Sequence, residues 1–475
     1  MHYAKWNLAV FFTAIVFLHA AGQTAAASTP DRPNVILCMT DDQGWGDTGY
    51  NGHPVLKTPE LDAMAAVGLR LNRFYTAAPL CSATRGSVMT GRHPNRFGCF
   101  GANYSIRPEE VTIAEAMKTA GYATGHFGKW HLGPVKAGTP INPNNSGFHE
   151  TLSHDNWFDI NPELCHNGGP PKTVEGETSE IVVSAALSFI RRQAAAKKPF
   201  LAVLWFPSPH TPCVAAEKYR KPYKNLSEKE QEYFGEIAGV DAAMGKLRRS
   251  LRQMNLAENT LLWFNSDNGP WKEDPGSTGG LRDFKRTIWE GGVRVPCLIE
   301  WPARITKPMT SDVPCSTMDI YPTIMDILDL KVPRQVNPLD GISLLPLIEG
   351  TMRQRPKPIP FWKYPAAAKR TNPQQYLTAD EATGTWRTFR NDRHPVARRP
   401  NELKGHAALV DNRYKLHKLA PDRFELYDIV ADPAETRDLA AAKPEVVEKM
   451  QADLEAWQLS VEQSLTGRDY ASGAQ

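Results

Sequence analysis

Two pairs of residues in the sequence carry the oxygen atoms that a metal ion needs. Asp41-Asp42 and Asp267-Asn268 each follow directly after a short apolar segment. Carboxylate and amide oxygens are hard ligands that suit Ca²⁺ better than Zn²⁺, and Mg²⁺ is the less favoured hard ion. An isolated Asp-Asp pair usually forms a turn or a helix cap, and Asp-Asn-Gly usually forms a tight turn. The pairs therefore predict a calcium site provided that the fold brings them together.

A lysine and two histidines occupy equivalent places after two further apolar segments. Lys129 and His131 follow one of these segments, and His210 follows the other. A lysine can neutralise an anion, and a histidine can transfer a proton near neutral pH. A single histidine after a strand is more often structural than catalytic. The placement of all these groups after apolar segments is what favours an active site.

The four apolar segments have the composition of buried parallel strands. They cover residues 34–39, 123–127, 200–206 and 261–265, and each is short, rich in large apolar side chains and bounded by polar or turn residues. Amphipathic helices are expected between them, at residues 112–120, 179–195 and 231–254. Alternating strands and helices predict an α/β fold with a mostly parallel sheet covered on both faces. Ligand sites in such sheets lie beyond the carboxyl ends of the strands, where the polar groups fall.

A smaller part of the chain follows residues 345–350. Residues 352–400 are rich in proline and basic side chains, and from Arg353 to Arg399 there are eleven Lys or Arg against three Asp or Glu. Strands are expected at residues 407–416 and 424–429, and a final helix at residues 444–465. We therefore expect a catalytic domain at residues 28–350 and a C-terminal α+β subdomain with a basic insertion at residues 351–475.

The first 27 residues have the pattern of a secretory signal peptide. Lys5 precedes an apolar run at residues 6–18, and three alanines at residues 25–27 offer a cleavage site. The run is shorter than the ~20 residues that span a bilayer, which argues against the alternative of a membrane anchor. The sequence therefore predicts a secreted or periplasmic protein with no membrane attachment after cleavage.

The overall composition excludes two classes of protein. The chain has 475 residues, with 55 Lys and Arg against 52 Asp and Glu, so its net charge is +3. A dedicated nucleic-acid-binding protein usually has a large basic excess, so no nucleic-acid partner is expected. Hydrophobic residues make up 41% of the chain, which is too many for an intrinsically disordered protein.

Residues 81–92, with the sequence CSATRGSVMTGR, resemble the signature of the type I sulfatases. In that family the cysteine is oxidised after translation to formylglycine, which is an aldehyde. The family usually has proline where this chain has Ala83, and serine where it has Thr84, but both residues stay within the tolerated pattern. The resemblance implies that Cys81 is converted to formylglycine by a formylglycine-generating enzyme or an anaerobic maturase.

Further segments resemble the same family in its order along the chain. They are residues 34–47, 121–133, 208–212, 266–269 and 280–296, with a C-terminal match at residues 425–435. The resemblance implies the alkaline-phosphatase-like fold. This fold has a large, mostly parallel sheet flanked by helices and a smaller C-terminal α+β subdomain.

The resemblance also implies a role for each matched residue. The ligands of Ca²⁺ would be Asp41, Asp42, Asp267, Asn268 and residue 81. One hydroxyl of hydrated formylglycine would attack the sulfur of a sulfate ester, and the second would expel sulfate and restore the aldehyde. Arg85 and Lys129 would hold the formylglycine oxygens, and His131 would be the base for sulfate release. His210 and Lys285 would bind the sulfate and protonate the leaving oxygen, with His210 as the general acid.

A sulfated carbohydrate is the expected substrate, because the family acts on several such polymers and this chain is expected to be exported. The candidates for sugar contact are Asn103, His154, Asn156, Trp157, Trp271 and Arg282. The basic stretch at residues 352–400 interrupts a pair of strands that the family usually joins closely. It is expected either to attract a polyanionic glycan at the mouth of the pocket or to form a solvated loop.

Two other functions stay open. Phosphonate monoester hydrolases also use formylglycine, and phosphodiesterases of the superfamily bind two zinc ions through histidines. Asp267-Asn268 in place of Asp-His, and Cys81 in place of serine or threonine, favour one hard cation and a sulfate ester. The second alternative is an inactive, glycan-binding sulfatase homologue. The presence of every expected catalytic residue argues against it.

Overall fold

The computed structural model describes residues 1–2, 32–365, 374–375, 390–391 and 403–473. The described residues from Pro33 onwards pack into one unit. Most of the predicted signal peptide, and most of the basic stretch with Arg393, Arg398 and Arg399, lie outside the described residues. The division into domains at residue 351 stays a prediction.

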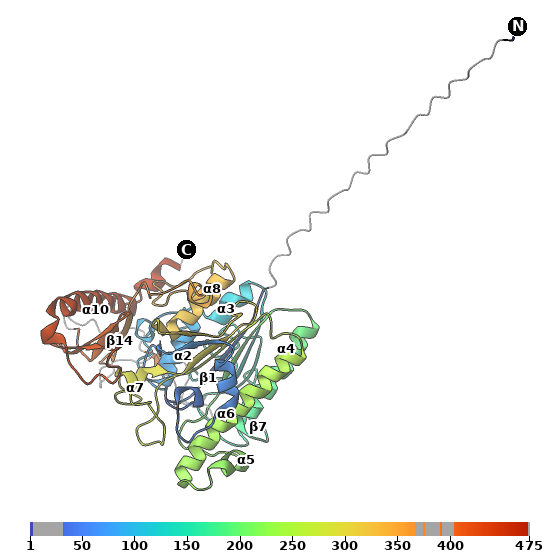
Figure 1. The fold of residues 1–475 in the computed structure, drawn as a ribbon, viewed down its shortest axis with the longest axis horizontal. Helices are drawn as coiled ribbons and strands as arrows, with labels where there is room; N and C mark the ends of the chain where they lie inside the picture. Colours follow the sequence, from blue (N-terminus) through green and yellow to red (C-terminus); the bar gives the residue numbers. More distant parts are fainter. Residues whose placement is uncertain (3–31, 366–373, 376–389, 392–402, 474–475) are drawn as a thin grey trace. The chain divides into compact units, whose positions relative to one another are not determined.

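The centre of the main sheet consists of five parallel strands (Figure 1). Their order is β9 (Thr260–Ser266), β1 (Asn34–Thr40), β8 (Phe200–Trp205), β4 (Ala123–Lys129) and β5 (Glu150–His154). The four predicted strands are therefore confirmed, each within two residues of its expected ends. Because these strands are parallel, their carboxyl ends all lie at one edge of the sheet, and β1 lies between β8 and β9 there.

Shorter strands extend the sheet on both sides to ten strands within the described residues. Beyond β9 lie β11 (Cys297–Glu300), which is antiparallel to β9, then β2 (Leu69–Leu71) and β12 (Met309–Ser311). Beyond β5 lie β6 (Glu163–His166) and β7 (Lys172–Thr173), each antiparallel to its neighbour. The predicted α/β class with a mostly parallel sheet is confirmed.

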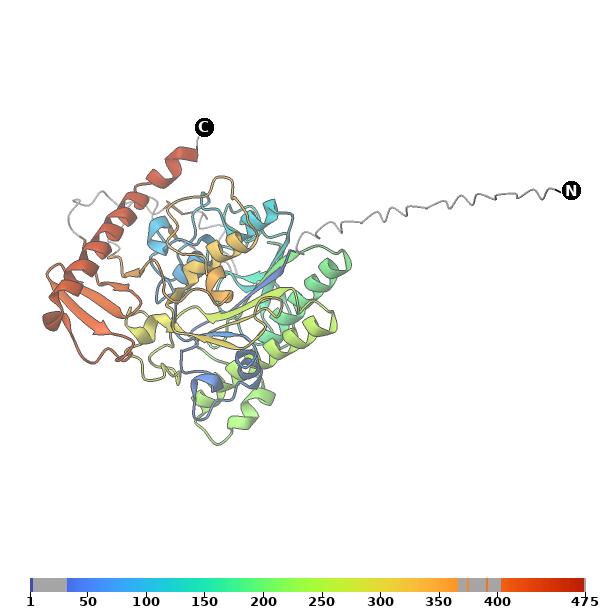
Figure 2. The ribbon, with the colours of Figure 1, turned by 45° about the horizontal axis from the view of Figure 1, so that its top comes forward.

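Helices cover both faces of this sheet (Figure 2). On β1, Val35, Leu37 and Met39 pack in a core with helices α2 (Cys81–Thr90), α3 (Ile113–Thr119) and α8 (Ile320–Ile327). Ile36 and Cys38 point into a second core with α1 (Pro59–Ala65), α4 (Thr178–Ala195) and α6 (Glu228–Gln253). Burial on both faces explains why the central strands are continuously apolar rather than alternating.

Side-chain caps set where the predicted helices begin. Thr112 and Glu115 form a reciprocal capping box at the start of α3. Ser227 and Glu230 form the same motif at α6, so that helix begins three residues before its predicted start at residue 231. Each box satisfies backbone N–H groups that the first helical turn leaves without a partner.

The C-terminal region is a four-stranded antiparallel sheet packed against one helix. The strands are β14 (Ile359–Trp362), β17 (Ala407–Val410), β18 (Tyr414–Ala420) and β19 (Arg423–Asp428), and the helix is α10 (Pro444–Leu465). The prediction of one strand at residues 407–416 was wrong. Asp411 Oδ1 accepts hydrogen bonds from the backbone of Arg413 and Tyr414 at 2.7 and 2.5 Å, which turns the chain between β17 and β18.

The remaining elements are short. They are η1 (Gly49–Asn51), β3 (Phe74–Tyr75), η2 (Pro94–Phe97), α5 (Glu217–Arg220), η3 (Lys221–Tyr223), α7 (Glu290–Val293), β10 (Arg294–Val295), β13 (Cys315–Ser316), η4 (Thr317–Asp319), α9 (Leu345–Ile348), β15 (Gln374–Gln375), β16 (Arg390–Asn391), η6 (Ala440–Ala442) and η7 (Arg468–Gly473). None of the helices in the described part of the chain combines the length and apolarity needed to cross a bilayer.

A buried ion pair joins the segment before β14 to the short helix η4. Arg355 donates to both carboxylate oxygens of Asp319 at 2.6 and 2.8 Å, and neither side chain is more than 1% exposed. Replacing Arg355 by alanine should lower the free energy of unfolding by about 3–5 kcal/mol, because it leaves the Asp319 charge buried without its partner. Chemical denaturation followed by circular dichroism would measure the change.

Arg413→Ala is the matched control for this prediction. Arg413 pairs with Asp428 at 2.8 Å, but its side chain is 64% exposed. Water screens such a pair, so its removal should change the unfolding free energy little. An equal loss in the two variants would contradict the assigned importance of the Arg355–Asp319 pair.

Candidate active site

The two predicted metal-binding pairs lie side by side because β1 and β9 are neighbours. Thr40 at the end of β1 is in register with Ser266 at the end of β9, so the next residues, Asp41 and Asp267, emerge together. The backbone N–H of Asp42 donates to Asp267 Oδ1 at 3.2 Å. The fold thus supplies the juxtaposition that the calcium prediction required.

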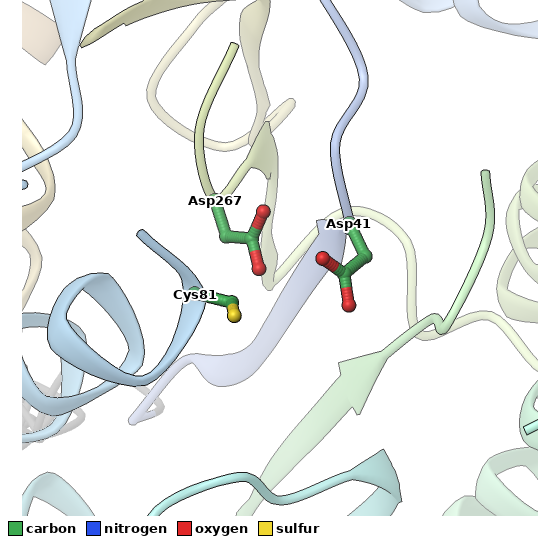
Figure 3. A group of neighbouring side chains, drawn as sticks. All are labelled: Asp41, Cys81 and Asp267. Atoms are coloured by element: carbon green, nitrogen blue, oxygen red, sulfur yellow. The ribbon is translucent and has the colours of Figure 1, made fainter. Parts of the chain in front are cut away.

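Cys81 completes this group from helix α2. Its Sγ atom and one carboxylate oxygen each of Asp41 and Asp267 all lie within 4.8 Å of one another (Figure 3). Cys81 is the first residue of α2, and Leu80 before it offers no side-chain cap. The free N–H groups and the positive end of the helix dipole therefore favour negative charge near residue 81.

Three cationic side chains balance the carboxylates. Lys129 donates to Asp41, and Arg85 donates to Asp267 Oδ2 at 2.8 Å and lies 3.4 Å from Asp41. Lys285 donates to Asp42 Oδ2 at 2.7 Å. These cations are at least nine-tenths buried, so their charges interact with little screening by water.

Trp205 supports Arg85, a role that its place in the sequence does not indicate. The Arg85 guanidinium lies over the Trp205 ring at 5.1 Å and also donates to the Lys129 carbonyl oxygen at 3.1 Å. A cation over an aromatic face is attracted to it, and the ring limits where the guanidinium can move. Trp205 is the last residue of β8, where its large apolar side chain predicts only core packing.

The buried carboxylates do not titrate alike. Burial alone would raise the pKa of Asp41, but the positive charges of Lys129, His210 and Arg85 hold it well below its usual range. Burial and the neighbouring Asp41 carboxylate raise the pKa of Asp267 to about 7. Two like charges this close do not both form readily, and a divalent cation between them would favour both ionised forms.

Two further atoms fit a hard cation. Asp41 Oδ1 and Asn268 Oδ1 are buried oxygens that accept no hydrogen bond within the described residues. A buried acceptor without a donor is costly unless a ligand satisfies it. Asn268 Nδ2 donates to Asp42 Oδ1 at 2.6 Å, which fixes the amide and leaves its oxygen as the coordinating atom. The donor set is therefore suited to Ca²⁺.

His210 and His131 flank this cluster. His210 Nε2 lies 3.8 Å from Asp42 Oδ2, and the ring of Trp157 is nearly parallel to that of His210 at 6.5 Å. Burial lowers the pKa of His210, against the effect of Asp42. Burial, with Lys129 and Arg85, places the pKa of His131 well below its usual value. The predicted catalytic residues are thus brought together at one edge of the sheet.

The predicted sugar-contact residues differ in burial and in hydrogen bonding. His154 Nδ1 accepts from the backbone of Asn156 at 3.1 Å, and Asn156 Oδ1 is a buried acceptor without a donor in the described structure. Trp271 is partly exposed, with the Arg286 guanidinium 4.4 Å from its ring. Their assignment as sugar contacts stays a prediction.

Asn103 and Arg282 contact other protein groups. Asn103 Oδ1 lies 3.0 Å from His131 Nε2. Arg282 lies over the Trp289 ring at 3.5 Å and donates to the hydroxyl of Tyr427 at 3.2 Å. These contacts add structural roles to the two residues.

Tyr233 is a further supporting residue that sequence analysis missed. Its hydroxyl donates to Asp47 Oδ2 at 2.8 Å and approaches the Asp42 carbonyl oxygen at 3.2 Å. Asp47 in turn accepts from the backbone of Gly44 and Ser277, both at 2.8 Å. This network holds the chain that follows Asp42. Nothing marks Tyr233 in the sequence, because it lies inside the amphipathic pattern of α6.

Solved structures share this fold. The crystal structure of Ps i-CgsB in complex with k-i-k-neocarrahexaose matches with a TM-score of 0.77 and 24% identity, and the match covers 94% of this chain and 98% of that one. The phosphonate monoester hydrolase of Agrobacterium radiobacter matches with a TM-score of 0.63 and 20% identity, over 90% and 96% of the two chains. At these identities the two structures support the fold only.

Sequence comparison gives closer relationships. The family model Sulfatase matches residues 33–330. The chain is 32% identical to human N-acetylgalactosamine-6-sulfatase over 410 residues, which cover 77% of this chain and 75% of the relative. It is 33% identical to human arylsulfatase A over 352 residues, which cover 67% and 68%. The chain belongs to the sulfatase family of the alkaline-phosphatase-like superfamily and is a sulfuric ester hydrolase.

Proposed function

We propose that the protein is an exported sulfatase that removes sulfate from a sulfated carbohydrate, using formylglycine at position 81 and Ca²⁺. The observation that carries this proposal is the position of Cys81. Its sulfur lies among the buried carboxylates at the start of α2. The cations Arg85, Lys129 and Lys285 surround the same carboxylates. A dianionic sulfate-bearing transition state needs this concentration of positive charge.

Cys81 would be the substrate of a formylglycine-generating enzyme or an anaerobic maturase. As its hydrate, formylglycine supplies one hydroxyl that attacks sulfur and a second that expels sulfate. The unmodified thiol is a poor nucleophile in this site, because burial raises its pKa. This argues for a modified residue at position 81.

Ca²⁺ would be held by Asp41, Asp42, Asp267 and Asn268. The cation, when bound, neutralises oxygen charge and makes a hydroxyl group easier to deprotonate. Lys285 donates to Asp42, and Lys129 donates to Asp41, so both ammonium groups lie beside these carboxylates. Their ammonium groups are thus close enough to share the neutralisation of a bound sulfate group.

Separate side chains would stabilise negative charge, donate a proton and accept a proton during the reaction. Arg85 and Lys129 hold developing negative charge on the oxygens of residue 81. His210, which lies 3.8 Å from Asp42, donates a proton to the leaving alcohol oxygen. Lys285 orients the sulfate, and His131 accepts a proton when sulfate departs.

A sulfated glycan is the substrate class that we propose. One relative is named N-acetylgalactosamine-6-sulfatase, and one structural neighbour was solved with neocarrahexaose. In this chain Asn156 offers a buried acceptor oxygen, and Trp157 and Trp271 offer partly exposed aromatic faces. Aromatic faces and hydrogen-bond acceptors suit a sugar ring. The basic stretch would attract the sulfate groups of such a polymer.

Export rests on the signal-peptide pattern of residues 1–27. A secreted or periplasmic enzyme would meet extracellular sulfated polymers directly. The same pattern predicts removal of these residues from the mature chain.

Phosphonate ester hydrolysis is the competing activity, and the fold of the Agrobacterium enzyme keeps it in consideration. The amide of Asn268 favours a single oxygen-liganded cation over the two histidine-rich zinc sites of phosphodiesterases.

Turnover should depend on Cys81. Cys81→Ala should lower kcat for a chromogenic aryl sulfate by at least about 10³-fold, because the nucleophile is lost. Cys81→Ser should release at most about one alcohol per active site, because serine lacks a second hydroxyl to expel sulfate. Rapid-mixing assays would count the alcohol released, and mass spectrometry of the residue 81 peptide would identify the aldehyde.

Cys165→Ala is the control, because Cys165 is also buried but lies on β6. It should keep full activity. A fully active wild-type enzyme with an unmodified thiol at position 81 would contradict the proposal.

Activity and stability should depend on a bound cation. Chelation should abolish activity, and Ca²⁺ should restore it better than Zn²⁺. Ca²⁺ should also raise the melting temperature, because a ligand that binds only the folded state stabilises by about 2.7 kcal/mol at a hundred times its Kd. Asp267→Asn should remove this shift, as measured by thermal denaturation with and without Ca²⁺.

Asp241→Asn is the matched control, because Asp241 is a buried carboxylate that accepts from the backbone of Leu61 at 2.8 Å, away from the cluster. It should keep the Ca²⁺-dependent shift. Restoration by Zn²⁺ and not by Ca²⁺ would overturn the assignment.

The basic stretch should affect the binding of polymeric substrates. Changing its arginines Arg390, Arg393, Arg398 and Arg399 to glutamine should raise KM for a sulfated oligosaccharide by about tenfold or more, and the effect should shrink at high salt. KM for a small aryl sulfate should not change. Steady-state kinetics on both substrates would measure this.

The control variant changes four exposed basic residues on α4 and α6: Arg191, Lys246, Arg249 and Arg252. It removes the same charge from another surface and should leave both KM values unchanged. Equal effects of the two variants on the oligosaccharide would show that only net charge matters.

A further inference from the structure

Asn103 contacts one of the two proposed proton-transfer histidines. Its Oδ1 atom lies 3.0 Å from Nε2 of His131. The backbone N–H of Asn103 donates to Ser82 Oγ at 3.2 Å, which ties this loop to the residue after Cys81. Asn103 therefore links the histidine to the first turn of α2.

Both partners of this contact have a left-handed backbone. The φ angle is +61° at Asn103 and +54° at His131. Residues other than glycine adopt this region only with backbone strain, although asparagine tolerates it best. His131 is also held by its backbone N–H, which donates to the Asp155 carbonyl oxygen at 3.0 Å. The conformation of both residues is thus set by the surrounding structure.

The contact defines which ring nitrogen carries a proton. The side-chain carbonyl oxygen of asparagine is only an acceptor, so Nε2 of His131 must be the donor. A neutral imidazole has one N–H group, which leaves Nδ1 with a free electron pair to accept a proton.

We propose that Asn103 is a positioning residue that holds His131 as the Nε2–H tautomer and so makes Nδ1 the base for sulfate release. This rests on the proposed function. In that step the remaining hydroxyl of residue 81 gives its proton to Nδ1, and its oxygen forms the aldehyde C=O bond. The bond from the same carbon to the sulfate oxygen breaks, and the electron pair leaves with sulfate. The wrong tautomer would present an N–H group where a base is needed.

Asn103→Gly is the most informative variant. Glycine adopts the φ of +61° without strain and removes the side chain that carries the acceptor oxygen. We expect kcat for an aryl sulfate to fall by about 10–100-fold, as for other groups that orient a catalytic ligand. KM should fall with kcat and leave kcat/KM unchanged, because only the step after alcohol release is slowed. Alcohol should appear in a burst before a slow steady state, because sulfate release becomes rate-limiting.

The tautomer itself can be measured without any turnover. Nitrogen NMR of histidine-labelled protein that keeps the Cys81 thiol should show His131 protonated at Nε2, with His131→Gln identifying the signal. Asn103→Gly should shift the population towards Nδ1–H, and Asn103→Asp, which keeps an acceptor oxygen, should restore Nε2–H. Circular dichroism would confirm that each variant is folded.

The two measurements separate the proposal from the function on which it rests. An inactive wild-type enzyme with the Nε2–H tautomer would contradict only the proposed function. An unchanged His131 tautomer in Asn103→Gly, or a variant with wild-type kcat and no burst, would overturn the role of Asn103.

Discussion

The structure depends on keeping three carboxylates close together at a buried strand edge. Asp41, Asp42 and Asp267 are each at most 1% exposed. Like charges in a poorly hydrated site repel strongly, so the surrounding protein must supply positive charge. Arg85, Lys129 and the start of α2 supply it here. The positive charge that offsets the repulsion between the buried carboxylates also favours binding of a negatively charged sulfate ester.

Much of the fold serves to deliver those charges from separate parts of the chain. The strand order brings Lys129 from β4 to Asp41, and a loop held by the C-terminal sheet brings Lys285 to Asp42. That loop leads into Glu290, whose carboxylate pairs with Lys415 of β18 at 2.9 Å, with both side chains fully buried. The C-terminal sheet therefore stabilises the loop that carries Lys285.

The sequence was sufficient to predict the strands and the groups that follow them, because buried parallel strands are continuously apolar and their carboxyl ends meet. It was not sufficient for contacts that depend on tertiary packing. Trp205 beneath Arg85 has only the signal of a core residue, and Asn103 was expected to touch sugar although the structure also places it on His131. The turn at Asp411 divides a predicted strand, because a side-chain hydrogen bond outweighs the apolar pattern on either side.

The most direct measurement is a crystal structure of the matured enzyme grown with Ca²⁺. Oxygens of Asp41, Asp42, Asp267 and Asn268 should surround one ion at about 2.3–2.6 Å, and residue 81 should carry an oxygen-bearing aldehyde hydrate in place of sulfur. A pair of ions with histidine ligands, or a Cys81 thiolate bound directly to zinc, would contradict a calcium-assisted formylglycine sulfatase.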